Sequence, residues 1–177
     1  NLYIADMWNY RIRRVSVNGI ITTIAGNERG RPLGKEGSAI DAPVWIRLLA
    51  AAGNGTVYAA ENREPGAGWS LSKIAPGGTI STLAGNDSSY TEEQKAAPGS
   101  QLYSPVGIAV DSAGGLYIAE DYKGRIRKME ASGAITTIAG TRIGGPTHLA
   151  LDTKGNLYIS QAQANRVRRI SADGIIT

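Results

Sequence analysis

The first 26 residues read NLYIADMWNYRIRRVSVNGIITTIAG, and the rest of the chain repeats this pattern three more times. Each repeat contains a run like LYIAD, which recurs at 56–61, 115–120 and 156–161. A run like RIRRV and a run like ITTIAG follow it. All of these runs are short, rich in Ile, Val, Thr, Leu and Tyr, and bounded by Gly, Asn, Asp or Ser, which is typical of β-strands joined by turns.

A fourth kind of run precedes three of the repeats, at 46–52, 106–111 and 147–152. The joints between runs hold Asn, Asp or Gly, as at Asn18–Gly19, and these residues tolerate the positive φ of hairpin turns. A unit of four antiparallel strands in about 40–50 residues has the size of a propeller blade. We therefore predict an all-β protein, a β-propeller of four-stranded antiparallel blades, with about 3.75 blades in this chain.

The pattern is incomplete at both ends of the sequence. The first repeat lacks its innermost strand and the last has a short outermost strand, within one propeller segment whose repeats span approximately 1–42, 43–104, 105–145 and 146–177. Four unlike blades could close into a small ring, but we favour either an excerpt of a longer chain or a unit that self-associates to complete a ring. Helical periodicity is weak throughout, and its best candidate, residues 91–97, is expected to form two turns at most.

Several stretches resemble the blades of NHL-repeat β-propellers, in particular those of bacterial proteins with many such repeats. These stretches are residues 1–26, 115–140 and 155–177, together with SPVGIAVD at 104–111. The resemblance covers nearly the whole chain. It implies a propeller that serves as an interaction platform and is secreted or otherwise extracytoplasmic in a bacterium. Some family members bind RNA and a few relatives are lyases with a His-bound metal, so the resemblance leaves the activity open.

The family has an acid at the end of the LYIAD-like run, then Asn, then Arg, and Asp6, Asn9 and Arg11 match this motif. The third repeat keeps Glu120 and Arg125, whereas the fourth has Gln161 in place of the acid. We expect the Arg of this motif to pair with the acid of the motif or with backbone carbonyls at the blade junctions. The second repeat departs most, because it has Ser where the Arg is expected and a longer loop before it.

Composition excludes several kinds of site. The chain has no Cys and a single His, His148, so thiolate chemistry and sites with two imidazoles from one chain are excluded. No apolar run reaches the roughly 20 residues of a membrane-spanning helix. The sequence predicts no catalytic residue, no metal site and no cofactor.

Aromatic residues gather in one class of connection. Strands alternate in direction. The loops between the LYIAD-like and RIRRV-like runs therefore lie at the same end of a blade as the loops that lead into the next blade. We name this end of the blades the loop end, and the opposite end the turn end. Long loops on a rigid scaffold commonly carry binding sites. We expect the loop end to bind a protein, peptide or glycan through Trp8, Tyr10, Trp45, Trp69, Tyr90, Tyr103 and Tyr122.

The net charge of +4 is concentrated in the RIRRV-like runs, whereas the charges of the loop end nearly cancel. Nucleic-acid binding at the loop end is therefore not expected. The basic residues in the middle of these runs are expected to extend their head groups into water at the outer side of the blades: Arg13, Arg14, Arg127, Lys128, Arg168 and Arg169. A smaller possibility is that this outer side binds acidic polymers.

Two alternatives to a binding platform stay open. One is a propeller lyase or hydrolase with its site at the mouth of the central channel, where Trp45, Gly107 and His148 are expected at equivalent positions because each follows a Pro by two residues. The other is a structural segment of a larger exported protein with several domains. Asp111 and Asp152 are expected to cap turns rather than to bind calcium.

Overall fold

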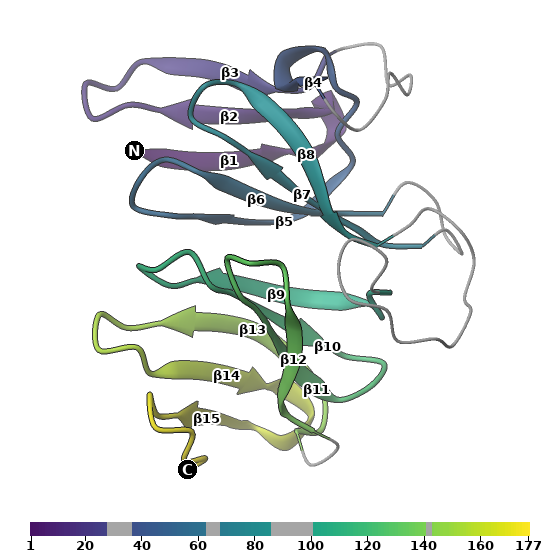
Figure 1. The fold of residues 1–177 in the computed structure, drawn as a ribbon, viewed down its shortest axis with the longest axis vertical. Helices are drawn as coiled ribbons and strands as arrows, with labels where there is room; N and C mark the ends of the chain where they lie inside the picture. Colours follow the sequence, from purple (N-terminus) through teal and green to yellow (C-terminus); the bar gives the residue numbers. More distant parts are fainter. Residues whose placement is uncertain (28–36, 63–67, 86–100, 141–142) are drawn as a thin grey trace. The chain divides into compact units, whose positions relative to one another are not determined.

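The computed structural model describes residues 1–27, 37–62, 68–85, 101–140 and 143–177. In these ranges the regular structure is β-strand, apart from three short 3₁₀ helices at Met7–Asn9 (η1), Ala39–Asp41 (η2) and Ala162–Ala164 (η3). The chain forms two compact units, Asn1–Glu92 and Glu93–Thr177, and each contains two antiparallel sheets (Figure 1). The prediction of an all-β fold of antiparallel blades is confirmed.

Unit 1 holds blades 1 and 2. Blade 1 is a three-stranded sheet of β1 (Leu2–Asp6), β2 (Arg11–Val15) and β3 (Ile21–Ala25). Blade 2 has the order β4-β8-β7-β6-β5, with bounds β4 (Gly37–Ser38), β5 (Ile46–Ala51), β6 (Val57–Glu61), β7 (Ser70–Ile74) and β8 (Thr79–Ala84). β5 is the innermost strand of blade 2 and lies beside β1.

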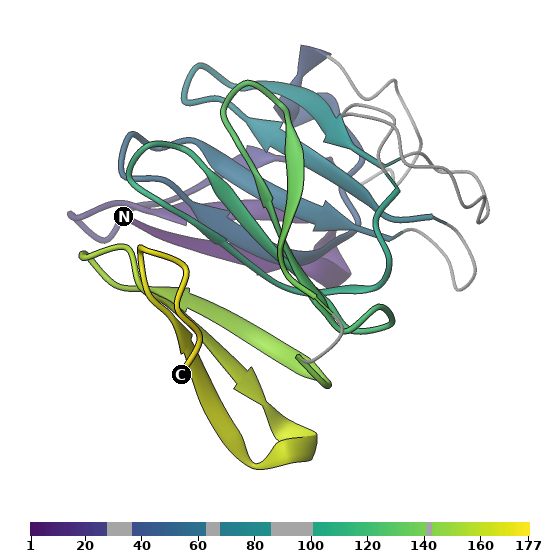
Figure 2. The same ribbon diagram turned by 60° about the horizontal axis from the view of Figure 1, so that its bottom comes forward.

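Unit 2 holds blades 3 and 4. Blade 3 is a complete four-stranded sheet of β9 (Pro105–Val110), β10 (Leu116–Glu120), β11 (Arg125–Met129) and β12 (Ile135–Ala139). Blade 4 consists of β13 (Pro146–Leu151), β14 (Leu157–Gln161) and β15 (Arg166–Ile170). The innermost strands of the two blades, β9 and β13, lie side by side (Figures 1 and 2).

Two strands differ from the sequence prediction. β4 is an additional strand, which pairs Gly37 with Ile80 on the outer edge of β8. The short outer strand expected at the C-terminus is only a bridge between Ile170 and Ile176, although the segment does fold back beside β15 (Figure 2). A two-residue edge strand leaves no periodic pattern in a sequence, so β4 could not have been predicted.

The turns follow the predicted chemistry. Asp111 Oδ1 accepts hydrogen bonds from the backbone N–H of Ala113 at 3.0 Å and of Gly115 at 2.7 Å. Asp152 repeats this arrangement in blade 4, where it accepts from the backbone N–H of Asn156 at 2.9 Å and from its side chain at 2.7 Å. Both aspartates therefore cap turns, as the sequence predicts.

The glycine that ends the ITTIAG-like run has a steric role in unit 1. Gly26 has a φ of +91°, and a Cβ there would lie 2.0 Å from the Tyr10 carbonyl oxygen. Gly85 has a φ of +81°, and a Cβ there would lie 1.9 Å from the Trp69 carbonyl oxygen. Only glycine fits both the backbone conformation and the space. The close approach fixes the residue that precedes β2 or β7, and both of those residues are aromatic.

Each unit has its own hydrophobic core. In unit 1 the core is contributed by both blades and includes Ile12, Ala25, Val44, Ile46, Val57, Ala59, Ile74 and Ile80. In unit 2 it includes Ala109, Ala119, Ile126, Ala139, Ile143, Leu157, Ile159 and Ile170. Small and β-branched side chains dominate, as is usual for closely packed sheets. The blades of each unit are thus joined by a shared apolar core, which makes a rigid support for the loops.

Candidate binding site at the loop end

In unit 1 the structure brings together two of the seven predicted site residues. Tyr10 follows η1 and has the left-handed φ of 54°, while Trp45 lies just before β5. Their ring centroids are 4.6 Å apart and the ring planes are inclined by 57°, a tilted geometry that is favourable for aromatic pairs. Trp8 lies in η1 and is 84% exposed. Trp8 is therefore free to contact a ligand, whereas Tyr10 and Trp45 support each other.

A buried carboxylate fixes the backbone of Trp45. Glu61, at the end of β6, is 4% exposed, and its Oε2 accepts a hydrogen bond from the Trp45 N–H at 3.2 Å. Its Oε1 accepts from the Ser72 hydroxyl at 2.8 Å. A carboxylate in this position needs such donors because its burial is costly. The acid of the repeat motif in blade 2 therefore positions an aromatic residue of the loop end.

Two predicted residues are less well connected or not described. Trp69 immediately precedes β7 and is half-buried. The ring contact between Tyr10 and Trp45 does not extend to Trp69 within the described ranges. Tyr90 lies outside the described residues, as does the helical candidate at 91–97.

In unit 2 the loop end holds an aromatic cluster around a cation. Lys123 Nζ lies 4.8 Å from the centroid of the Tyr103 ring and 5.4 Å from that of Tyr122. The Cζ of the Arg125 guanidinium also lies near this ring, 5.6 Å from the centroid of Tyr103. These distances are within the range of cation–π interactions. Tyr122 is 74% exposed, so the cluster presents both an aromatic face and a positive charge to solvent.

A second buried carboxylate holds this cluster in place. Glu120 ends β10 and is fully buried; its Oε1 accepts the Tyr103 N–H at 2.9 Å, and its Oε2 forms an ion pair with Arg125 Nε. Tyr103 also donates its hydroxyl to Gln101 Oε1 at 2.7 Å. The predicted pairing of the motif Arg with its acid is confirmed here. The same acid that pairs with Arg125 also fixes the aromatic residue.

Arg127 corrects one prediction. It was expected at the solvated outer side, but its Nη1 donates to the Gln101 carbonyl at 3.0 Å and lies 3.9 Å from Glu120 Oε1. Burial lowers the pKa of Arg127 from its ordinary value, and the nearby Glu120 opposes that shift. Arg127 therefore belongs to the buried support of the Tyr103 cluster. The reason is that alternate residues of β11 face opposite sides of the blade, and this side is covered.

In blade 4 an amide replaces the carboxylate. Gln161 is 1% exposed; its Oε1 accepts from Arg166 Nε at 2.8 Å and its Nε2 donates to the Gly144 carbonyl at 2.7 Å. The glutamine therefore uses both halves of its amide, as acceptor and as donor. The loop end of blade 4 carries none of the seven predicted aromatic residues.

The predicted equivalence of Trp45, Gly107 and His148 is wrong. Gly107 pairs with Ala119 and His148 with Ser160, whereas the residue of β5 at the same register, paired with Ala60, is Leu48. All three strands share a bulge at this point, but Pro105 and Pro146 are the first paired residues of β9 and β13, whereas β5 begins at Ile46, three residues after Pro43. His148 itself is exposed, and its backbone N–H donates to Ser160 Oγ at 3.1 Å.

Sequence reasoning missed the cations of the loop end. Lys123 and Arg125 flank Tyr103, although they are distant from it in the sequence. The run from Tyr122 to Arg125 reads YKGR, and the two basic residues that closely follow an aromatic one were the available signal. Within the described ranges no group of three or more His, Asp or Glu side chains is arranged to hold a metal ion.

Solved structures similar to this chain are β-propellers. Virginiamycin B lyase from Staphylococcus aureus matches with a TM-score of 0.61 and 16% identity over 99% of this chain and 50% of that one. A gluconolactonase from Xanthomonas campestris matches with a TM-score of 0.61 and 18% identity over 95% of this chain and 54% of that one. A Bacteroides thetaiotaomicron protein of unknown function reaches a TM-score of 0.68 at 20% identity, over 94% of this chain and 43% of that one.

These likenesses show that the chain has a β-propeller fold, and at this identity they show the fold alone. The chain spans about half the length of the solved structures it matches. No family model matches the sequence, and no curated protein matches it. In the part of the chain that the structure describes, no helix is long and apolar enough to cross a membrane.

Proposed function

We propose that the chain is a segment of an NHL-type β-propeller that binds a protein, peptide or glycan at its loop end without catalysis. The observation that carries this proposal is the aromatic cluster of unit 2, where Lys123 lies against Tyr103 and the exposed Tyr122. Tyr and Trp, which combine a large aromatic surface with a polar group, are among the residues most enriched at binding hot spots. The NHL assignment rests on the repeat motif, and secretion from a bacterial cell rests on the same resemblance.

The support beneath the aromatic residues strengthens the proposal. In both units a buried glutamate, Glu61 or Glu120, accepts the backbone N–H of an aromatic residue at the loop end. A binding surface loses less entropy when its contact residues are held in place before the ligand arrives. The same kind of support therefore serves both Trp45 and Tyr103.

The experiment is a ligand screen with matched surface variants. The whole chain would be screened against a peptide library and a glycan array, and each ligand found would be tested with Trp8→Ala and with Tyr122→Ala. Both side chains are largely exposed, at 84% and 74%, so these variants should unfold at the wild-type temperature. Loss of a hot-spot aromatic weakens binding by about 2 kcal/mol or more.

The control is Val17→Ala, because Val17 is equally exposed, at 86%, but lies in a turn between β2 and β3 at the turn end. The proposal requires that Val17→Ala binds like the wild type. It is contradicted when the ligands bind both aromatic variants with unchanged affinity, or when Val17→Ala weakens binding as much as they do.

An enzymatic role is a second candidate, because two of the similar propellers are described as a lyase and a gluconolactonase. In this chain the residue that would serve it is His148, exposed on the innermost strand β13. Metal analysis of the purified protein tests this candidate. A stoichiometric divalent ion that is lost in His148→Ala would favour it over a binding platform.

Self-association is a third candidate, since the chain spans about half of the propellers it matches. Light scattering over a dilution series tests whether two copies associate. A dimer stable to dilution would favour a role in assembly, and the ligand screen would then be made on the dimer.

A further inference from the structure

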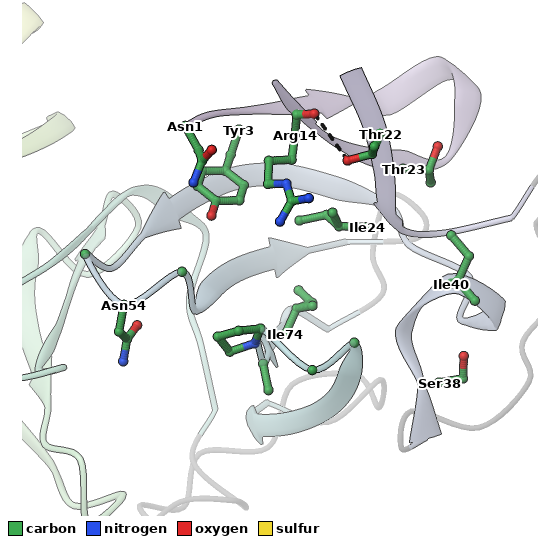
Figure 3. Close-up of a pocket in the computed structure, with 16 residues that line it drawn as sticks. Asn1, Tyr3, Arg14, Thr22, Thr23, Ile24, Ser38, Ile40, Asn54 and Ile74 are labelled. Atoms are coloured by element: carbon green, nitrogen blue, oxygen red, sulfur yellow. Dashed lines mark hydrogen bonds between the residues drawn. The ribbon is translucent and has the colours of Figure 1, made fainter. Parts of the chain in front are cut away.

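A cleft of about 690 Å³ lies in unit 1, between blade 1 and blade 2 (Figure 3). Its size falls within the range of small-molecule sites. Tyr3, Arg14 and Ile24 face it from blade 1, while Asn54 and Ile74 lie across from them in blade 2. The loop-end proposal does not use any of these residues.

The cleft is separate from the loop end. β5 begins at Ile46, next to Trp45, and ends at Ala51, after which the turn at 53–55 lines the cleft. The turn at 75–78 between β7 and β8 lines it as well. The cleft is therefore at the turn end of unit 1, a strand length away from Trp45. A ligand here would leave the aromatic residues of the loop end untouched.

Arg14 gives the cleft its charge. It is the only residue with a charged side chain among the described residues that line the cleft, and no Asp or Glu is among them. Its Nε is buried and has no hydrogen-bond partner within the described ranges; Arg13 Nε is in the same state, but of the two residues only Arg14 lines the cleft. A buried donor without a partner is costly. A guanidinium has only N–H donors, so the group that pairs with it must be a hydrogen-bond acceptor. A carboxylate is the planar acceptor that fits a guanidinium best.

The rest of the lining is neutral and has many hydroxyls. Tyr3, Thr22, Thr23 and Ser38 contribute hydroxyl groups. The Asn54 Oδ1 accepts the Thr56 N–H at 3.0 Å, which orients its amide NH₂ away from that bond as a donor. Such groups exchange hydrogen bonds with the hydroxyls of a ligand in either direction.

The lining also has an apolar part, and the mouth is open. Ile24, Ile74 and Pro76 supply carbon surface on which the C–H groups of a ring could pack. At Gly53, Gly77 and Gly78 even an added Cβ would meet nothing within 4 Å. The glycine turns therefore leave backbone groups accessible at the entrance of the cleft.

We infer that this cleft binds a small molecule that carries a carboxylate and several hydroxyl groups, such as a uronic acid, with Arg14 pairing with the carboxylate. The position of Arg14 in the lining, with a buried Nε, differs from the expectation that it extends into water at the outer side of its blade. Arg13, its neighbour in the sequence, does not line the cleft. The two residues are adjacent in β2, so their side chains leave the sheet on opposite faces.

The experiment follows backbone amide signals by nuclear magnetic resonance while the whole chain is titrated with galacturonate. The amides of Gly53, Gly55, Gly77 and Gly78 should shift, because these residues line the cleft. Galactose, which lacks the carboxylate, should bind at least about tenfold more weakly, the loss expected for one hydrogen-bonded charge. Acetate, which lacks the hydroxyls, should also bind more weakly than galacturonate.

Arg14→Gln should reduce galacturonate binding to the level of galactose. Arg13→Gln is the matched control, because it makes the same substitution one residue away and should keep wild-type binding. If Arg14→Gln does not fold, Arg14→Lys keeps the charge and should still prefer galacturonate over galactose. The inference is overturned when galacturonate leaves the four glycine signals in place, when galactose or acetate binds as tightly, or when Arg14→Gln and Arg13→Gln behave alike.

Discussion

Glu120→Gln tests how the loop end of unit 2 is supported. Glu120 is fully buried; it accepts hydrogen bonds from the Tyr103 N–H at 2.9 Å and from Arg125 Nε, and its Oε1 lies 3.9 Å from Arg127 Nη1 as an ion pair. The glutamine has the same shape but only one acceptor oxygen, so its NH₂ group must face one of these donors. One hydrogen bond is lost and two guanidinium groups lose their counter-charge.

The size of the effect follows from burial. Removing one partner of a fully buried ion pair costs about 3–5 kcal/mol. Here the side chains of Arg125 and Arg127 are 21% and 12% exposed, so water compensates in part. A hydrogen bond to a charged group contributes about 1.5–3 kcal/mol. We expect Glu120→Gln to lower the free energy of unfolding by about 2–3 kcal/mol, which lowers the melting temperature by roughly 5–10 °C in a domain of this size.

The assay is urea unfolding followed by far-ultraviolet circular dichroism, with amide hydrogen exchange as a local measurement. The Tyr103 amide should exchange faster in Glu120→Gln, because it loses its acceptor. The matched reverse change is Gln161→Glu in blade 4, which places a carboxylate oxygen against the Gly144 carbonyl, now 2.7 Å from the Gln161 Nε2. It should lower the free energy of unfolding by about 1–2 kcal/mol, since pairing with the exposed Arg166 returns little.

The reasoning is refuted when Glu120→Gln changes the free energy of unfolding by less than about 0.5 kcal/mol, which is the range of ordinary surface substitutions. It is also refuted when Gln161→Glu stabilises the protein. Either result would mean that the acid and the amide are interchangeable at the end of these strands. The different donors around them would then not determine which residue is present.

Two further predictions concern the turns and the glycines. Gly26→Ala should destabilise the protein by about 3 kcal/mol or more, because a Cβ there lies 2.0 Å from the Tyr10 carbonyl oxygen at a φ of +91°. Gly19→Ala, at a φ of +77° with nothing within 4 Å, should cost only about 1 kcal/mol in the same unfolding measurement, and equal costs would contradict the steric explanation. The Asp152 pKa is lowered from its ordinary value of 3.8, mainly by the hydrogen bond from the Asn156 side chain. The stabilisation from Asp152 is therefore complete above pH 3.8 and is lost as the pH falls below it, so Asp152→Ala should unfold with a weaker dependence on acid pH than the wild type.

The positions of most strands could be predicted from the sequence because they depend on local properties. β-branched residues, repeated four times and separated by Gly, Asn or Asp, indicate strands and turns whatever their neighbours are. The turn caps Asp111 and Asp152 and the pairing of Glu120 with Arg125 were predicted on the same basis, since each pair lies within a few residues. The propeller fold followed from the repeat, because a four-stranded unit must bury its faces against further units.

The candidate site could be predicted only in part. The seven aromatic residues were chosen from the direction of the strands, and the structure brings Tyr10 into contact with Trp45 and places Tyr103 with Tyr122 around Lys123. Which acid fixes which aromatic backbone, as Glu61 does for Trp45, was not predicted. Such hydrogen bonds join the last residue of one strand to a residue shortly before the neighbouring strand, and this contact exists only once the two strands pair.

Tertiary structure alone decided the strand register and which side chains face a neighbouring blade. The sequence by itself determined the strands, their turns and the blade as their unit, because these follow from short-range sterics and hydrogen bonds. It did not determine that Leu48 rather than Trp45 matches His148, since Pro105 and Pro146 begin their strands whereas Pro43 lies three residues before the equivalent position, Ile46. Nor did it determine that Arg14 lines a cleft while Arg13 does not. Alternate residues of a strand leave on opposite faces, but which face meets a neighbouring blade is set only when the blades pack.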